Sequence, residues 1–125
     1  MYGHQLEMLK REELIKEGKK MNYQQKAKQF AVYDNNLYPF LALAEEAGEV
    51  AAIAAKSVRA GNGDRWGLSE EDIDVCKLAD ELGDVLWNVA MICEEFDLDM
   101  REVMEENIAK LTVRKAKKEI LERGK

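Results

Sequence analysis

Two short groups of acidic residues interrupt apolar stretches of the sequence. The first contains Glu45, Glu46 and Glu49 in an Ala-rich stretch, and the second contains Glu81 and Asp84 among Leu and Val residues. Side chains three or four residues apart share one face of a helix. If the two stretches form helices that pack antiparallel, their carboxylates converge.

Converging carboxylates repel one another in an interior of low dielectric, so either their pKa values rise or a cation neutralises them. The donors are hard oxygen atoms without sulfur or imidazole, which favours Mg²⁺, or else Mn²⁺, over zinc. Mg²⁺ keeps several waters and takes further ligands from substrate phosphates. A nucleoside triphosphate is therefore the expected ligand.

Two other interpretations of these acids remain open. They could form a solvated face that pairs with Lys and Arg, as most charged helix positions do, although two acid pairs inside apolar runs make this less favoured. A di-iron bundle would also use Glu residues, but it needs a Glu-x-x-His arrangement. The single histidine, His4, lies in the N-terminal segment and is expected at the surface.

The composition indicates one all-α domain. The chain has 125 residues, 46% of them hydrophobic, which suffices for one core and not for two. One Pro, eight Gly and many Ala, Leu, Glu and Lys residues are typical of helices. Residues 1–20 are expected to be an N-terminal extension, either helical or loose, and residues 21–125 to be the domain.

Periodicity and capping signals predict four helices, joined by short connections, that form an antiparallel four-helix-type bundle. Their expected ranges are about 22–33, 39–60, 69–96 and 100–122. The third is expected to begin at a capping box of Ser69 and Asp72. The inward face of the fourth should contain Val103, Ile108 and Leu111, and the expected core includes Tyr23, Phe30 and Tyr38.

The net charge of −6 hides an asymmetry along the chain. Residues 21–108 hold 19 acids against 7 bases, whereas residues 109–125 hold 7 bases against 2 acids. The acidic body argues against nucleic-acid binding. No apolar run approaches a membrane span, and Cys76 and Cys93 fall in one predicted helix, too far apart for a disulfide. We expect a reduced, cytoplasmic protein without a membrane partner.

Three segments resemble MazG-like pyrophosphohydrolases of the all-alpha NTP pyrophosphatase superfamily. The segments Leu43–Val50 and Glu81–Trp87 resemble the EExxE…ExxD signature. The later segment Asn107–Arg114 is similar to the closing Asn-x-x-Lys-x-x-x-Arg of the family. Each segment alone is weakly specific, but all three occur in order between about residues 22 and 118.

The resemblance implies that the acids hold one or more Mg²⁺ ions on a triphosphate. The implied metal ligands are Glu46, Glu49, Glu81 and Asp84. Glu45 completes the implied catalytic set, either in the outer shell or as a base acting through a water. Which carboxylate is the base stays open.

Further residues are candidates for binding the substrate. Lys110 and Arg114 lie four apart and could face the phosphates, with Asn107 one turn earlier, and Lys56 is a weaker candidate for the same role. The alternative is a solvated basic helix end. For the base, Trp87 could stack and Asn88 could read an edge, although a tryptophan at this position is more often core or subunit interface.

Members of the family assemble as dimers or tetramers, and the Ala-rich second and apolar third helices offer more apolar surface than one short bundle covers. We therefore expect a homodimer or homotetramer that completes the bundle. The implied function is Mg²⁺-dependent hydrolysis of a (deoxy)nucleoside triphosphate to the monophosphate and pyrophosphate, in nucleotide-pool control or house-cleaning.

Three other functions are compatible with parts of this pattern. A phosphoribosyl-ATP pyrophosphohydrolase of histidine synthesis shares the helical carboxylate site. The segment Asn107–Arg114 favours a nucleoside triphosphate pyrophosphohydrolase over this enzyme. Dimeric dUTPases of the superfamily are usually longer. A non-catalytic helical module that binds a metal or a basic partner is the alternative from another class.

Overall fold

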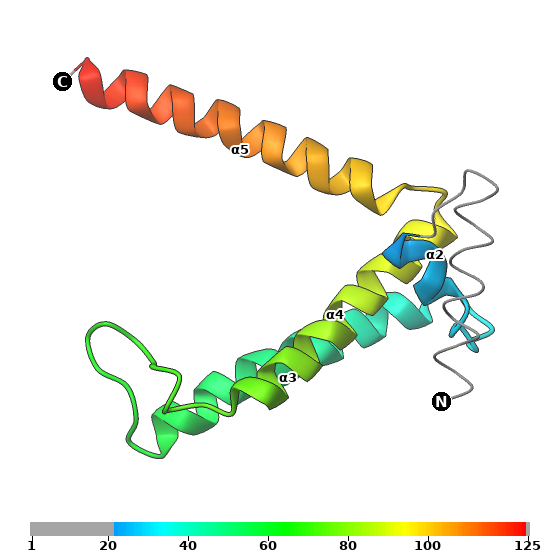
Figure 1. Cartoon of the computed structure of the whole chain (residues 1–125), viewed down its shortest axis with the longest axis horizontal. Helices are drawn as coiled ribbons and strands as arrows, with labels where there is room; N and C mark the ends of the chain where they lie inside the picture. The colour runs from blue at the N-terminus through cyan, green and yellow to red at the C-terminus, as the bar shows by residue number, and fades with distance from the viewer. Residues whose placement is uncertain (1–21, 125) are drawn as a thin grey trace, which may run out of the picture.

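The computed structural model describes residues 22–124, and the predicted extension 1–20 lies outside these described residues. The described part is all-α, which confirms the expected fold class, with one isolated bridge between Asp64 and Gly67. Its helices, shown in Figure 1, are α2 (Tyr23–Lys28), α3 (Tyr38–Arg59), α4 (Val75–Glu95) and α5 (Met100–Arg123).

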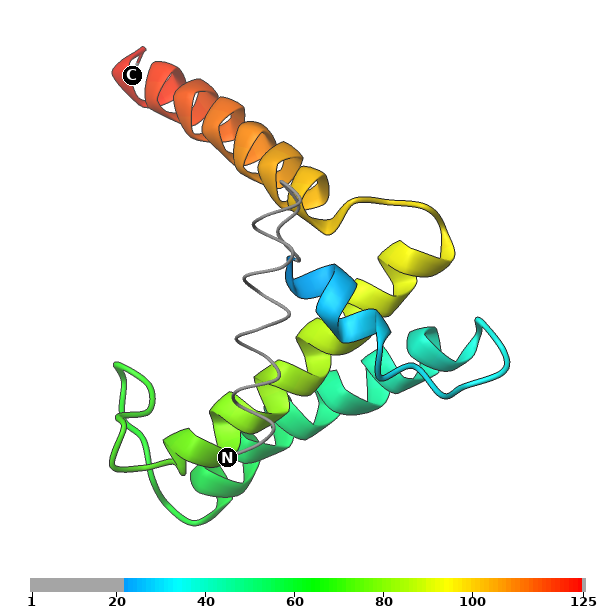
Figure 2. The same ribbon diagram turned by 45° about the vertical axis from the view of Figure 1, so that its right-hand side comes forward.

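Helices α3 and α4 run antiparallel along each other for most of their lengths (Figures 1 and 2). Pro39 lies in the first turn of α3, where its missing N–H is not needed, and Gly61 follows the last turn with φ +92°. Buried Ser57 fastens the following loop, since its Oγ donates to the Asp72 carbonyl at 2.6 Å. The predicted second helix is confirmed.

The start of α4 differs from the prediction. Asp74 caps the helix by accepting a hydrogen bond from the Lys77 amide at 3.1 Å. Ser69 and Asp72 instead form a turn, in which the Ser69 amide donates to Asp72 Oδ2 at 2.9 Å and the Asp72 amide to the Ser69 carbonyl at 3.0 Å. The predicted helix start at Ser69 was wrong because this pairing closes a single turn, and the extended backbone of Asp74, with ψ 98°, separates that turn from α4.

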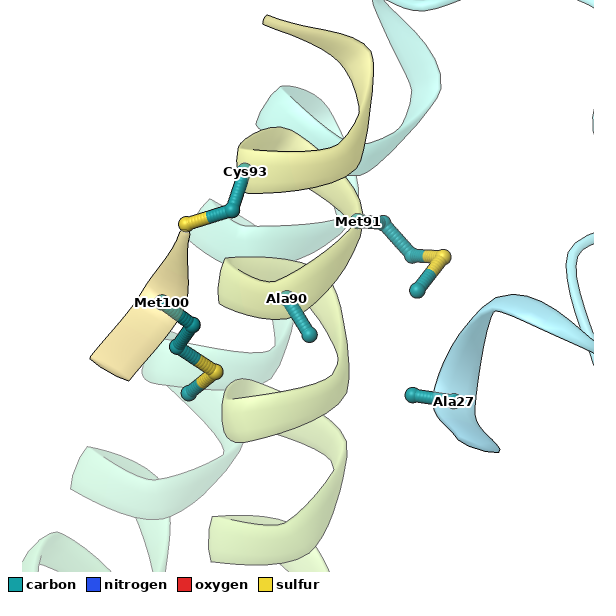
Figure 3. Close-up of a cluster of buried hydrophobic side chains, with 5 residues drawn as sticks. All are labelled: Ala27, Ala90, Met91, Cys93 and Met100. Atoms are coloured by element: carbon teal, nitrogen blue, oxygen red, sulfur yellow. The ribbon is translucent and has the colours of Figure 1, made fainter. Parts of the chain in front are cut away.

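The short helix α2 packs across α4 near the α4 C-terminus. It ends at Lys28, five residues before the predicted end, and a capping box of Asn22 and Gln25 fixes its start. The buried core lies where α2, α4 and the first residue of α5 meet (Figure 3). Its members are Ala27, Ala90, Met91, Cys93 and Met100.

Helix α5 leaves the α3–α4 pair and does not pack back along it (Figure 1). Met100 is its only buried residue, and the expected inward residues Val103, Ile108 and Leu111 are exposed. The expected inward face of α5 was therefore wrong within one chain, and completion of the bundle by oligomerisation stays a prediction. The connection 96–99 turns the chain sharply, with Asp97 in the left-handed region at φ 55°.

The expected aromatic residues do not belong to the core of the single chain. Tyr23, Phe30 and Tyr38 are each about half exposed or more. Cys76 is exposed near the start of α4 and Cys93 is buried near its end, so they are separate free thiols. No described helix combines the length and apolar character needed to cross a membrane.

Replacing Met91 by Ala tests the core. Met91 has no exposed surface, so its truncation leaves a cavity and should lower the free energy of unfolding by about 2–5 kcal/mol. Urea unfolding at one protein concentration measures the loss. The matched control is Met104→Ala on α5, whose side chain is 58% exposed in the single chain. Equal losses for both variants would contradict this core.

Candidate functional site

Three carboxylates from two helices meet at the seam between α3 and α4. Glu46 comes from α3, and Glu81 and Asp84 come from α4. One oxygen from each lies within 4.8 Å of the others. Glu81 and Asp84 share a helix face because they are three residues apart, and the antiparallel packing of α3 brings Glu46 to that face. We refer to these residues as the acidic trio.

The electrostatics of the acidic trio match the repulsion expected from the sequence. The pKa of Glu46 is raised, first by removal of its carboxyl group from water and then by a side-chain hydrogen bond with Glu81. The charges of Asp84, Glu81 and Glu45 raise it further. Without a cation, Glu46 therefore releases its proton less readily than an isolated glutamate does.

The donor set of the acidic trio fits a hard divalent cation. All three donors are carboxylate oxygens, which suit Mg²⁺ or Mn²⁺. Two oxygens bound to one Mg²⁺ at ~2.1 Å are at most ~4.2 Å apart, so only small side-chain movements are needed to close the 4.8 Å grouping. Glu46 and Glu81 are partly buried and Asp84 is exposed, which leaves a side for waters or phosphate.

The remaining predicted residues of α3 lie outside this grouping. Glu49, expected as a fourth metal ligand, is exposed and is not part of the acidic trio. Glu45 is also exposed and acts on Glu46 through its charge. Lys56 is exposed two turns beyond Glu49, on the same side of the helix.

Asn88 lies one turn beyond Asp84 and carries an unpaired polar atom. The side chain is 3% exposed, and its Nδ2 donates to the Asp84 carbonyl at 2.9 Å. Its Oδ1 is buried and has no hydrogen-bond partner among the described residues. Because the Asp84 carbonyl can only accept, the Asn88 amide must direct its Nδ2 to it. The acceptor Oδ1 of Asn88 is then left without a donor. A buried acceptor without a donor costs about 1–3 kcal/mol, which is a reason to expect a further partner here.

Trp87 is committed to packing between helices. Its Nε1 donates to the Ala27 carbonyl at 3.1 Å, and its ring meets Tyr33 edge to face with centroids 6.3 Å apart. The indole therefore fastens α2 to α4 in the described chain. Within one chain, Trp87 therefore packs as a core residue, which was the alternative to stacking on the nucleotide base.

Tyr23, which the sequence suggested only as a core residue, is a neighbour of the acidic trio. The pKa of Tyr23 is raised by burial and by the charge of Asp84, which places this exposed phenol near the acids. Tyr23 belongs to α2, so its position depends on how α2 packs on α4. No spacing rule within the sequence connects residues 23 and 84.

The predicted phosphate-binding residues are separate from the acidic trio within one chain. Asn107, Lys110 and Arg114 are exposed on α5, which diverges from the α3–α4 pair (Figures 1 and 2). We refer to them as the α5 stripe. The structure does not bring the α5 stripe to the carboxylates of its own chain.

Replacing Glu46 by Gln tests the electrostatics. A carboxyl group whose pKa is raised on folding stabilises the fold fully below its ordinary value of 4.5, and this contribution is lost as pH rises through the raised value. Gln imitates the protonated form. In EDTA, over a pH series that starts below 4.5, the Tm of Glu46→Gln should therefore exceed that of the wild type by a margin that grows with pH until Glu46 is fully ionised.

The control is Glu106→Gln on α5, which should show no such divergence. Mg²⁺ should raise the Tm of the wild type and of the control, and should raise that of Glu46→Gln less. A constant difference in Tm across this pH range would contradict the raised pKa.

Comparison with known proteins adds a family to this geometry. The profile of the MazG nucleotide pyrophosphohydrolase domain matches residues 36–118, which include the acidic trio and the α5 stripe. Searches of curated proteins and of solved structures gave no match. The match spans more than half of the chain, and the arrangement is all-α. The protein belongs to the MazG nucleotide pyrophosphohydrolase family.

Proposed function

We propose that this protein hydrolyses a (deoxy)nucleoside triphosphate to the monophosphate and pyrophosphate in the presence of Mg²⁺. The observation that carries the proposal is the convergence of Glu46, Glu81 and Asp84 on one point at the helix seam. Membership of the MazG family supports the reaction class. The role would be control or cleaning of the nucleotide pool.

The acidic trio would hold the ion, and Glu49 would join it by a side-chain movement as the substrate enters. A bound divalent ion neutralises charge on the phosphates and lowers the pKa of an attacking water. The water oxygen bonds to the α-phosphorus as the bond to the bridging oxygen breaks, and pyrophosphate leaves. The proton of the attacking water would pass to a carboxylate that does not bind the ion. Exposed Glu45, whose charge acts on Glu46, is our candidate for this base.

Neutral and basic side chains would position the nucleotide around the acidic trio. The unpaired Oδ1 of Asn88 requires a donor such as an N–H or hydroxyl group of the substrate. Lys56 would attract phosphates from the exposed side of α3. Trp87 would contribute by holding α2, and with it Tyr23, at the edge of the site.

A second copy would supply the α5 stripe. Within one chain α5 leads away from the acidic trio, so Lys110 and Arg114 reach an acidic trio only on another molecule. Apolar side chains are exposed both on the helix pair and on α5, which suits an interface between copies. They include Val58, Leu82, Leu86, Ile108 and Leu111. We therefore propose that the protein is a homodimer or homotetramer.

Pyrophosphate release tests the reaction. A panel of common and modified nucleoside triphosphates, with and without Mg²⁺, should include at least one that releases pyrophosphate only when the metal is present. Asp84→Asn should lower kcat/KM by roughly a hundredfold or more, because it removes a charge that holds the ion. Glu49→Gln should cause a comparable loss if Glu49 joins the acidic trio.

Glu106→Gln, which keeps the charge pattern of the acidic trio, should retain full activity. The variants should also keep the helical circular dichroism of the wild type, so that a loss is assigned to chemistry. Release from phosphoribosyl-ATP alone would replace the proposed substrate class. A folded wild type that binds Mg²⁺ and hydrolyses no member of the panel would favour a non-catalytic module.

Replacing Ile108 by Glu tests the assembly. Ile108 is 62% exposed in the single chain, so a charge there should not unfold the chain but should disrupt an apolar interface. Sedimentation should show dimers or larger assemblies for the wild type and smaller species for the variant, with lower activity. Lys117→Glu on the same helix is the control. A wild type that stays monomeric at all concentrations would refute the proposed assembly.

A further inference from the structure

The side chain of Gln24 binds α2 to the segment that joins α4 to α5. Its Nε2 donates to the Leu98 carbonyl at 2.8 Å, and its Oε1 accepts from the Met100 amide at 2.7 Å. The side chain is 7% exposed, and these contacts span more than seventy positions of sequence. One buried amide therefore satisfies both a carbonyl and an N–H at the point where the chain changes direction.

This change of direction is tightly specified. Asp97 adopts φ 55°, and the Leu98 amide donates to the Cys93 carbonyl at 2.8 Å, which closes the end of α4. Asp99 then caps α5 by accepting from the Arg101 amide at 2.9 Å. Gln24 binds between these two local features, so it holds the two helix ends relative to each other. We call residues 96–99 the elbow.

Few other contacts fix the orientation of α5 relative to the rest of the described chain. Met100 is buried in the core cluster, but every later described residue of α5 is exposed. The hydrogen bond of Thr112 and the ion pair of Lys115 lie within the helix itself. A small rotation at residues 98–100 would therefore move the far end of α5 by a large distance. Apart from the bonds of Gln24, it would disturb mainly the Asp99–Arg101 pair and the packing of Met100.

Gln is well suited to this position. Its amide offers a donor and an acceptor on one planar group, and both are needed here. An apolar side chain of similar size would fill the space but leave the Leu98 carbonyl and the Met100 N–H without their partner. Helix α2 itself is well anchored, because its capping box fixes the start and the Trp87 indole binds its Ala27 carbonyl.

We propose that Gln24 is a positioning residue, which fixes the angle of α5 at the elbow and so places the α5 stripe against the acidic trio of a partner copy. The placement in a partner's site rests on the proposed function. The control of the angle does not, because it follows from the contacts of Gln24 within one chain.

The first test measures the angle directly in the full-length chain. A spin label on exposed Cys76 and a second on a cysteine introduced at Glu119 report the distance between the start of α4 and the end of α5, with labelled protein diluted by unlabelled protein. The wild type should give one narrow distance distribution. Gln24→Met should give a broader or shifted one.

The control is Gln25→Ala, which removes the neighbouring capping contact of α2 and leaves the amide of Gln24 in place. It should keep the narrow wild-type distribution. An unchanged distribution in Gln24→Met would overturn the proposal, as would equal broadening in Gln25→Ala. Circular dichroism and Tm establish that each variant is folded.

The second test measures the consequence for catalysis. Displacing the α5 stripe should raise KM by roughly tenfold to a hundredfold in Gln24→Met, with a smaller change in kcat, because ground-state phosphate contacts are misplaced. Gln25→Ala should keep the wild-type KM. A changed distance distribution with unchanged KM would overturn the link to the site. Absence of hydrolysis in the wild type would refute the proposed function, while the distance measurement would still decide the role of Gln24.

Discussion

Mutual repulsion among the carboxylates of Glu46, Glu81 and Asp84 is the constraint that the helix pair must overcome. The seam that holds these acids is partly withdrawn from water, which strengthens their repulsion. The long antiparallel contact of α3 and α4 opposes it, and the loop bond of Ser57 adds to this at one end. At the other end, α2 is bound across α4 through Trp87. The packing of α3 on α4 and the bonds at both ends of the pair therefore hold three like charges together at one seam.

The acidic trio could be predicted because its determinants are local. The spacing of Glu81 and Asp84 fixes their shared face, and the spacing of apolar residues in both stretches indicates two long helices that pack on each other. The ends of α3 were likewise predictable from Pro39 and Gly61, since these residues act through their own backbone. In such cases the sequence contains the whole of the physical cause.

Other features depend on pairs of residues distant in sequence. The direction of α5 follows from Gln24 meeting Leu98 and Met100, and the place of Tyr23 beside Asp84 follows from the packing of α2. Neither pair has a periodic signal. The pattern at Ser69 failed for a different reason, because a turn and a helix cap use the same side-chain and backbone groups. Choosing between them requires knowing where the preceding loop is fastened.

Because α5 diverges from the helix pair, the molecule has a basic end on α5 and an acidic body. The helix carries the basic excess of residues 109–125 away from a body with far more acids than bases. Two copies that approach each other would thus experience an orienting torque before their apolar surfaces touch, basic helix toward acidic body. Such steering accelerates encounter and weakens as salt screens it over about 10 Å at 0.1 M ionic strength. This separation of charge would set the relative orientation of a pair.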